Sequence, residues 1–217
     1  MSTSNPRARY REQVRAEIRA HAWEQIGRAG ATALSLKAIA KQMGMSAPAL
    51  YRYFSSRDEL LTELILGAYR DLAETMENVA EEEGGTSPEQ RLRRLGQALR
   101  GWAVADPQRY LLLYGTPVPG YAAPPEATEL AQRSLAPTVA ALTASASASG
   151  GAARDPAIAL RRAVVAWTRL HGVLSLELAG HFAGMDLDPE QLYADEIEST
   201  SASDETPGPV AARGQVS

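Results

Sequence analysis

The sequence predicts an all-α fold of about nine helices, because apolar residues recur every three or four positions along most of the chain. The alternating apolar and polar pattern of β-strands is missing. A third observation is a repeated helix-start signal, in which a capping Ser or Asp precedes a proline at the first helical position. This signal occurs at Ser87, Asp106, Asp155 and Asp188.

The composition is that of an ordinary globular protein, with 45% hydrophobic and 22% charged residues among 217. No apolar run reaches the ~18 residues of a membrane-spanning helix, and no apolar segment follows the basic N-terminus as it would in a secretory signal. Without Cys, the chain has neither a disulfide framework nor thiolate metal ligands. We expect a cytoplasmic protein with no membrane partner.

The first helix is predicted from about Pro6 to Ala29, and Gly30 is expected to end it. Residues four positions apart form its apolar stripe, namely Val14, Ile18, Ala22 and Ile26.

Two short helices follow, and a tight turn joins them. The first begins after the N-cap Ser35 and runs to Gly44, and the second begins after Ser46 with Pro48 in its first turn. Two short helices joined by a Gly-containing turn form a helix-turn-helix, whose second helix can lie in a DNA major groove. We expect the two helices to pack together through Ile39, Ala40, Met43, Leu50 and Phe54.

A long fourth helix is expected over residues 56–83. Ser56 and Glu59 have the S-x-x-E spacing of a capping box at its start. Its apolar positions are Leu60, Leu61, Leu64, Ala68, Leu72 and Met76.

The remaining chain alternates helices with two interruptions, a Pro/Gly loop at 115–126 and a low-complexity linker at 143–155. A long apolar helix is predicted over 157–182, and a final helix from Asp188 to about Glu198. The tail at 200–217 has little apolar content and is expected to be disordered.

Charge is distributed unevenly along the chain. Residues 1–60 contain ten Lys or Arg and five Asp or Glu, whereas the whole chain has a net charge of −4. Such asymmetry indicates a basic head that faces a polyanion and an acidic body, although charge fluctuates along any chain. The only lysines, Lys37 and Lys41, both lie in the helix-turn-helix.

Residues 34–61, LSLKAIAKQMGMSAPALYRYFSSRDELL, resemble the DNA-binding head of the TetR family of bacterial transcription regulators. The resemblance extends over roughly residues 8–65 and includes the Ile-Ala pair, the G-x-S turn and the L-Y-x-Y-F run. It implies phosphate contacts by Ser35, Tyr51 and Arg57. It also implies base or groove contacts by Lys37, Ala47, Ala49, Arg52 and Tyr53.

Each of these positions also has a purely structural interpretation. Tyr51 could be a core tyrosine, Arg52 and Arg57 could be solvated surface charges, and Ser35 is a helix cap in either case. Arg57 stands where the family usually has Lys, and both side chains bind phosphate.

A homodimer on a palindromic operator is predicted, because one head reads too few base pairs and two-fold symmetry doubles the interface. The 157–182 helix is apolar around much of its circumference, which suggests burial on two sides. The resemblance implies that the last two helices form the dimer bundle, and a plain core helix is the alternative. The expected interface residues are Ala163, Ala166, Leu174, Leu178, Leu192 and Ile197.

The body is similar to the W-H-G class of TetR-family C-terminal domains at residues 167–172, and residues 106–121 fit that class too. This resemblance implies an inducer site, and space lined by aromatic residues suits an apolar small molecule. The candidate pocket residues are Trp102, Tyr110, Tyr114, Tyr121, Trp167 and His171. Any one of them could instead be ordinary core, and a His on an apolar helix is more often a hydrogen-bonded core residue.

We therefore interpret the chain as a ligand-responsive transcriptional repressor that binds a palindromic operator as a homodimer. A small apolar or aromatic effector is expected to release it. Its head spans residues 1–55, helix 56–83 links the head to the body, and the ligand-binding and dimerisation body spans 56–199.

The alternative is a helical dimer that binds a small molecule without specific DNA binding. An enzyme is not expected, because the chain lacks a P-loop, a dinucleotide fingerprint and a nucleophile elbow. No cofactor and no metal are expected either.

Overall fold

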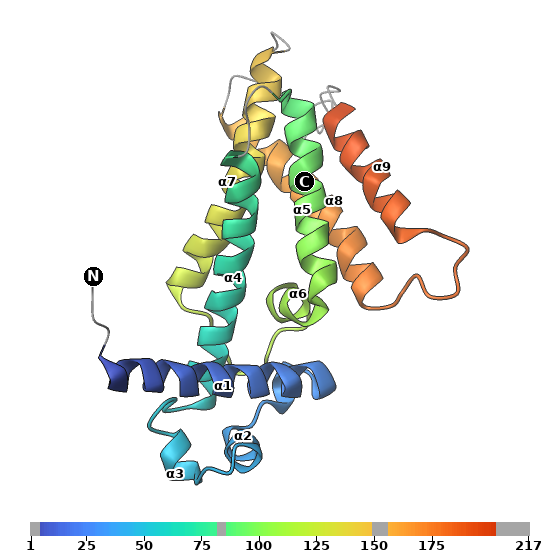
Figure 1. Cartoon of the computed structure of the whole chain (residues 1–217). Coiled ribbons are helices and arrows are strands. Elements are labelled where there is room, and N and C mark those ends of the chain that lie inside the picture. Colours follow the sequence, from blue (N-terminus) through green and yellow to red (C-terminus); the bar gives the residue numbers. More distant parts are fainter. Residues whose placement is uncertain (1–4, 82–85, 149–155, 203–217) are drawn as a thin grey trace, which may run out of the picture.

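The computed structural model describes residues 5–81, 86–148 and 156–202, and all regular structure in these ranges is helical, as predicted. Figure 1 shows a small head at one end and a body of long helices standing on it. The helices are α1 (Pro6–Ala29), the 3₁₀ turn η1 (Ala31–Ala33), α2 (Leu36–Gln42), α3 (Ala47–Leu50), α4 (Arg57–Glu81), α5 (Pro88–Ala105), α6 (Pro107–Tyr114), α7 (Pro125–Ala148), α8 (Pro156–Leu178) and α9 (Pro189–Ala202). Among the residues described, none of these helices combines the length and apolar character that a membrane span requires.

The head is built from α1, α2, α3 and the first half of α4. In Figure 1, α1 lies across the base of the body, and α2 and α3 hang below it. Gly30 ends α1 with a φ of 76°, a left-handed conformation that glycine adopts without strain. The predicted packing is confirmed, because one buried cluster contains Ile18, Ile39, Ala40, Leu50, Phe54 and Leu60.

α4 belongs to both cores of the molecule. Its first half places Leu60, Leu61 and Leu64 in the head cluster, and its second half places Leu72 and Met76 in the body cluster. A movement of this one rigid helix relative to the body would therefore reach the head directly.

The start of α4 differs in part from the predicted capping box. The Ser56 Oγ accepts the Glu59 N–H at 3.0 Å, as predicted. The Glu59 carboxylate turns to Ser55 instead, where it accepts the backbone N–H at 2.7 Å and the hydroxyl at 2.6 Å. The Ser55 hydroxyl is the main cause that lowers the pKa of Glu59.

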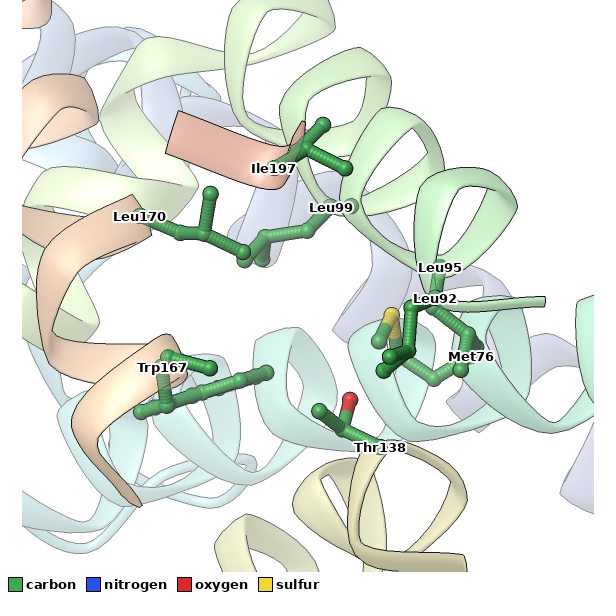
Figure 2. A pocket seen from close by; sticks show the side chains of 10 residues that line it. Met76, Leu92, Leu95, Leu99, Thr138, Trp167, Leu170 and Ile197 are labelled. Atoms are coloured by element: carbon green, nitrogen blue, oxygen red, sulfur yellow. The ribbon is translucent and has the colours of Figure 1, made fainter. Parts of the chain in front are cut away.

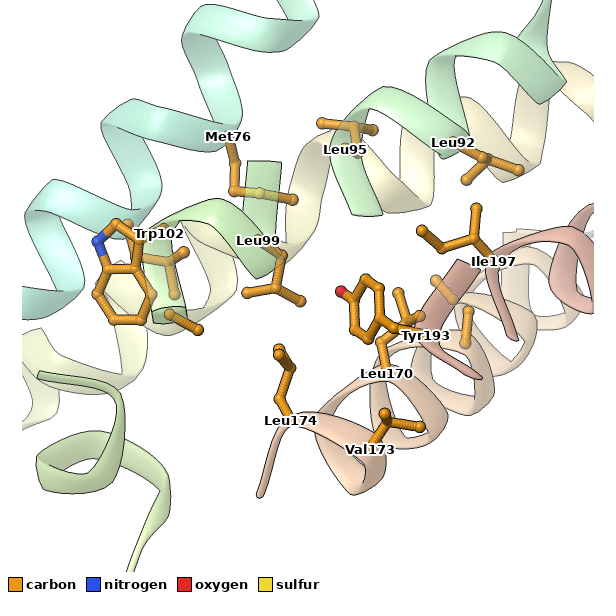
Figure 3. Close-up of a cluster of buried hydrophobic side chains, with 14 of the residues drawn as sticks. Met76, Leu92, Leu95, Leu99, Trp102, Leu170, Val173, Leu174, Tyr193 and Ile197 are labelled. Carbon is orange, nitrogen blue, oxygen red and sulfur yellow. The ribbon is translucent and has the colours of Figure 1, made fainter. Parts of the chain in front are cut away.

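The body packs α4, α5, α7, α8 and α9 around a second apolar core. α4 packs against α5 and α7, and α8 packs against α7 and α9 (Figure 1). Figure 3 shows this core, to which α5 contributes Leu92, Leu95 and Leu99, and α9 contributes Tyr193 and Ile197. Each such side chain contributes about 1.5–3 kcal/mol through its removal from water.

The predicted proline starts are confirmed for the described residues. α5, α6, α8 and α9 each begin at a proline. Ser87 and Gln90 form a complete capping box, in which each side chain accepts the other residue's backbone N–H. Asp155 lies outside the described residues.

Four predicted boundaries were wrong, the first being the helix expected over 157–182, since α8 ends at Leu178. α7 begins at Pro125, inside the loop expected over 115–126, and it continues to Ala148, into the linker expected over 143–155. α9 continues to Ala202, past the predicted end near Glu198. In α7 the alternating Ala and Ser residues hold a helix, because Ala is the strongest helix former and the buried Leu142 anchors the preceding turn. Residues 149–155 and 203–217 lie outside the described part.

Candidate functional site

The helix-turn-helix has the local structure that its capping residues predict. The Ser35 Oγ accepts the N–H of Ala38, and the Ser46 Oγ accepts the N–H of Ala49, each at 3.4 Å. Gly44 makes the turn with a φ of 65°. Both short helices therefore begin with a side-chain cap that sets their direction.

We define the recognition surface as the predicted base or groove contacts together with Tyr51: Lys37, Ala47, Ala49, Tyr51, Arg52 and Tyr53. Lys37, Tyr51 and Arg52 are exposed, with Tyr51 at 41%, so Tyr51 is not a core tyrosine. The two alanines are half-buried, and Tyr53 packs with one side against the head core. The helix-turn-helix thus brings three exposed polar side chains and two small ones together, Lys37 from α2, the alanines from α3, and Tyr51 and Arg52 from the turn after α3.

Arg57 occupies a structural position that the sequence did not reveal. Its Nε donates to the Leu34 carbonyl at 3.2 Å, and its Nη2 donates to the Ala31 carbonyl at 2.9 Å and the Thr32 carbonyl at 3.4 Å. The side chain is half-buried and ties the start of α4 to η1. Arg57 therefore holds the segment that leads into α2.

Two α1 arginines, which sequence reasoning missed, hold the end of α3. The Arg11 Nη2 donates to the Arg52 carbonyl at 3.3 Å, and the Arg15 Nη1 donates to the Tyr53 carbonyl at 2.6 Å. The Arg15 guanidinium also lies 4.1 Å from the centroid of the Phe54 ring. In the sequence, the spacing of four residues between Arg11 and Arg15 indicates that both side chains lie on the same face of α1.

Several cations of the head remain without a carboxylate. Arg15 and Arg19 both pair with Glu63, and Arg19 also pairs with Glu12 at 2.7 Å. Within the described ranges, no ion pair involves the remaining basic residues near the recognition surface, namely Arg7, Arg9, Arg11, Lys37, Lys41 and Arg52. This end of the molecule consequently presents uncompensated positive charge, which suits a polyanion.

Four of the six predicted pocket residues meet in one aromatic cluster in the body. The Tyr110 hydroxyl donates to the His171 carbonyl at 3.1 Å and lies 3.0 Å from His171 Nδ1 and 2.9 Å from Ser175 Oγ. The ring centroids of Tyr114 and Trp167 lie 4.2 Å and 4.5 Å from that of His171. Sequence reasoning missed Ser175.

The other two predicted pocket residues lie elsewhere. The Trp102 Nε1 donates to Asp71 Oδ2 at 2.8 Å, which links α5 to α4. The Tyr121 hydroxyl lies 2.9 Å from Thr62 Oγ1 and its ring packs against the head core. Neither side chain joins the His171 cluster.

His171 is a hydrogen-bonded residue of the core. Burial lowers the pKa of its imidazole to about 4, so the ring is neutral near pH 7. Its Nε2 is buried and has no hydrogen-bond partner among the described residues. Burial also raises the pKa of Tyr110 and of Tyr114.

A narrow apolar cavity lies beside this cluster (Figure 2). Its volume is about 20 Å³, which is room for about one water molecule. Trp167 is the one predicted pocket residue that lines it, and most of the remaining wall is aliphatic, with Leu95, Leu99, Leu170 and Ile197 among the lining residues. No group of three or more acidic or histidine side chains that could hold a metal occurs in the described part.

Four of the predicted dimer residues require a correction. Ala163, Ala166, Leu174 and Ile197 are buried in the chain's own core, so their side chains do not reach a partner. The small size of the alanines serves close packing of α8 within one chain. Leu178 and Leu192 are half-buried against the same core, and their dimer role stays a prediction.

The exposed face of α8 is a different apolar stripe. Leu160, Val164 and Leu176 are exposed at 49%, 43% and 44%, and Gly172, which lies between Val164 and Leu176 in the sequence, is exposed as well. Steps of four residues place neighbours one turn apart but advance by about 40° each around the axis, so this stripe winds around α8, with Leu160 and Leu176 toward opposite edges of the exposed side.

Comparisons with known proteins agree with this architecture. The family described as bacterial regulatory proteins, tetR family, matches residues 18–64, and the family described as tetracyclin repressor-like, C-terminal domain, matches residues 92–200. The crystal structure of the regulatory protein SCO4313 has a TM-score of 0.80 and 52% identity, covering 90% of this chain and 98% of that chain.

Two relatives from Mycobacterium tuberculosis are HTH-type transcriptional regulators. Rv1816 is 48% identical over 118 residues, which are 54% of this chain and only 50% of Rv1816. Rv0681 is 26% identical over 172 residues, covering 79% of this chain and 72% of Rv0681. These relatives are regulators, in keeping with the expectation that the chain is not an enzyme. By its matched head, its matched body and its likeness to SCO4313 over nearly all of that chain, the protein belongs to the TetR family of bacterial regulatory proteins.

Proposed function

We propose that the protein is a transcriptional repressor that binds a palindromic operator as a homodimer and is released by a small apolar or aromatic effector. The observation that carries this proposal is the recognition surface, where capped short helices present Lys37, Tyr51 and Arg52 to solvent among unpaired cations. Residues of this kind on an exposed helix surface are explained by a nucleic-acid partner.

Phosphate and base contacts have separate roles in this proposal. Ser35, Tyr51 and Arg57 contact phosphates and fix the register of the head on the duplex. Lys37 and Arg52 supply hydrogen bonds to base edges, whereas Ala47 and Ala49 offer only apolar contact to thymine methyl groups. The basic N-terminal turns of α1, with Arg7 and Arg9, would add contacts to the flanking backbone.

The exposed stripe of α8 is the proposed dimer seam. A second copy that packs on Leu160, Val164 and Leu176 would cover apolar surface that one chain leaves in water. Gly172 would let the two helices approach closely at the centre of the seam.

α4 provides the route from effector to DNA. Because its two halves lie in the two cores, an effector that changes the body core would shift α4 and with it the spacing of the two heads. A coupling of about 1–3 kcal/mol would weaken operator binding roughly 5–150-fold.

Selection of bound sequences from a random duplex pool, at one fixed near-physiological salt concentration, tests the proposal. The full chain should recover a two-fold palindrome, because two symmetric heads read two half-sites. Recovery of unrelated sequences with strong salt sensitivity would contradict specific recognition. The helical dimer that binds a small molecule without specific DNA binding would then be the better interpretation.

A further inference from the structure

Two hollows of the body share a single side chain. The small apolar cavity and a larger groove of about 400 Å³ on the outside of the body are both lined by Ile197 of α9. The groove runs between α5 and α9 and has polar walls, including Arg93 and Arg100 of α5 and Glu190 of α9. Figure 2 shows Ile197 across the cavity from Trp167.

The Ile197 side chain packs closely against α5. A Cβ at Gly96 would lie 2.7 Å from the Ile197 Cδ1, so the isoleucine rests directly on the α5 backbone at this glycine. The Tyr193 hydroxyl donates to the Gly96 carbonyl at 3.0 Å one turn away. Ile197 is the residue that the linings of the cavity and the groove have in common.

The ion pair between Arg100, which lines the groove, and Glu177, which lies behind Arg100 and does not line it, is incompletely satisfied. The Arg100 Nη2 donates to Glu177 Oε1 at 2.8 Å, and both side chains are less than one-fifth exposed. The Arg100 Nε and the Glu177 Oε2 are buried and lack a hydrogen-bond partner in the described part. A ligand hydroxyl or primary amide can accept a hydrogen bond from the Arg100 Nε–H and donate one to the Glu177 Oε2.

The charges of the same region disfavour an anionic head group. Glu177, Glu190 and Glu198 face Arg93 and Arg100, so the carboxylates outnumber the guanidinium groups. A ligand carboxylate would meet like charge there, whereas a neutral polar group would not.

We propose that the cavity and the groove form one site for a neutral aliphatic amphiphile, an alkyl chain with a single hydroxyl or amide head. The chain takes the place of the Ile197 side chain and enters the cavity between leucines and Met76, whose unbranched side chain readily adjusts its shape. The head binds between Arg100 and Glu177. This inference rests on the effector part of the proposed function and assigns that effector a site and a chemical class.

The test uses the full chain without DNA, with 1-octanol, 1-decanol and octanoate as probes. Calorimetry measures affinity, and stopped-flow tryptophan fluorescence measures association rates. We expect affinity to rise about fourfold for each added methylene, since each buries the same apolar area. The alcohol should bind about tenfold more tightly than the carboxylate of equal length, because the carboxylate leaves the Glu177 acceptor unpaired.

Variants locate the site and its opening. Ile197→Ala should raise the association rate about tenfold, because it removes the side chain between groove and cavity. Leu142→Ala removes a similar side chain from the same core without lining either hollow, and it should leave the rate unchanged. Arg100→Lys keeps the charge but removes the Nε donor, from which both the alcohol and the carboxylate can accept, so it should weaken the binding of both probes. If Ile197→Ala does not fold, Ile197→Val provides the same comparison with one methyl group removed.

Equal association rates in Ile197→Ala, Leu142→Ala and the unchanged chain would overturn the assigned opening and favour access beside Trp167. Tighter binding of octanoate would overturn the neutral head, and no binding of any probe would overturn the site. Failure of the proposed function can be distinguished from failure of this inference. Alcohol that binds as described but does not release a selected palindrome would refute the effector role alone, and release by an unrelated compound without alcohol binding would refute only this inference.

Discussion

The guanidinium of Arg57, the first residue of α4, donates to the backbone carbonyl of Leu34, 23 positions earlier, at 3.2 Å. This contact places a residue of the proposed DNA surface in the internal structure of the head. One side chain thereby links the start of α4 to the turn that leads into α2.

Arg57→Ala should lower the free energy of unfolding by about 1–3 kcal/mol, because it leaves the part-buried carbonyls of Leu34 and Ala31 without their charged donor. It should also weaken binding to all duplexes alike and reduce the log–log salt slope by about one, if the side chain neutralises one phosphate. Denaturant unfolding and DNA titrations at several salt concentrations measure both effects. Arg57→Lys is the control, since it keeps the charge and loses the geometry of the two main carbonyl bonds. An unchanged salt slope would remove Arg57 from the phosphate contacts.

Tyr51→Phe should weaken binding to every duplex several-fold, about 1 kcal/mol, through loss of one phosphate hydrogen bond. Because Tyr51 is exposed, the free energy of unfolding should stay the same. Fluorescence anisotropy with the selected palindrome and with an unrelated duplex measures the two affinities. A loss confined to the palindrome would instead make Tyr51 a base-reading residue.

Gly96→Ala should destabilise the fold by about 1–3 kcal/mol, because the new methyl group overlaps the Ile197 side chain and forces it out of its position against α5. Gly101→Ala on the same helix is the matched control, since a Cβ there meets nothing within 4 Å. The control should stabilise the protein by about 0.5–1 kcal/mol through the higher helix propensity of Ala. Thermal unfolding of both variants measures the difference, and equal shifts would show that α9 does not depend on the contact at Gly96.

His171 predicts a specific loss of stability in acid. The pKa of His171 is about 4 in the folded protein, whereas the ordinary value of 6.5 applies to the unfolded chain. Between pH 4 and pH 6.5, His171 is therefore protonated to a greater extent in the unfolded chain than in the folded protein. The free energy of unfolding should therefore fall as the pH is lowered from about 6.5 to about 4, by up to about 3 kcal/mol. Denaturant titrations across this range, compared with His171→Phe, isolate the contribution. The variant loses the contact with Tyr110 at every pH, so the two proteins are compared by the slope of the free energy of unfolding against pH. Equal slopes would contradict the lowered pKa of His171.

Val164→Glu should convert the dimer into monomers, because it places a charge within the proposed α8 seam. Val104→Glu is the control, as Val104 is similarly exposed, at 40%, on α5. Sedimentation velocity measures whether each variant is a dimer or a monomer, and only Val164→Glu should be a monomer. Dissociation by both, or by neither, would remove the α8 stripe from the interface.

Local chemistry made much of the fold predictable. Helix starts follow from Ser-Pro and Asp-Pro pairs, because a capping oxygen and a proline without N–H act within one turn. The apolar stripe from Val14 to Ile26 likewise predicts which face of α1 is buried, since burial in an amphipathic helix follows its period. The family resemblance at residues 34–61 rests on the same short-range features.

The end of α7 was less predictable, because Ala and Ser alternation is compatible with both a linker and a helix. The neighbouring packing, including buried Leu142, decides between them. The prediction of a capping box at Glu59 was wrong in its second half for a similar reason, since two serines competed for one carboxylate.

By itself, the sequence determined the helices, the helix-turn-helix and the residues that could face DNA, because each depends on contacts within a few positions. Only the tertiary structure decided which side of α8 faces the chain's own core, so that Ala163 and Leu174 pack inside while Val164 stays in water. It also decided that Arg57 binds Leu34 and that Ile197 rests on Gly96. A helix that is apolar around its circumference has several faces it could bury, and only contacts between distant segments select among them.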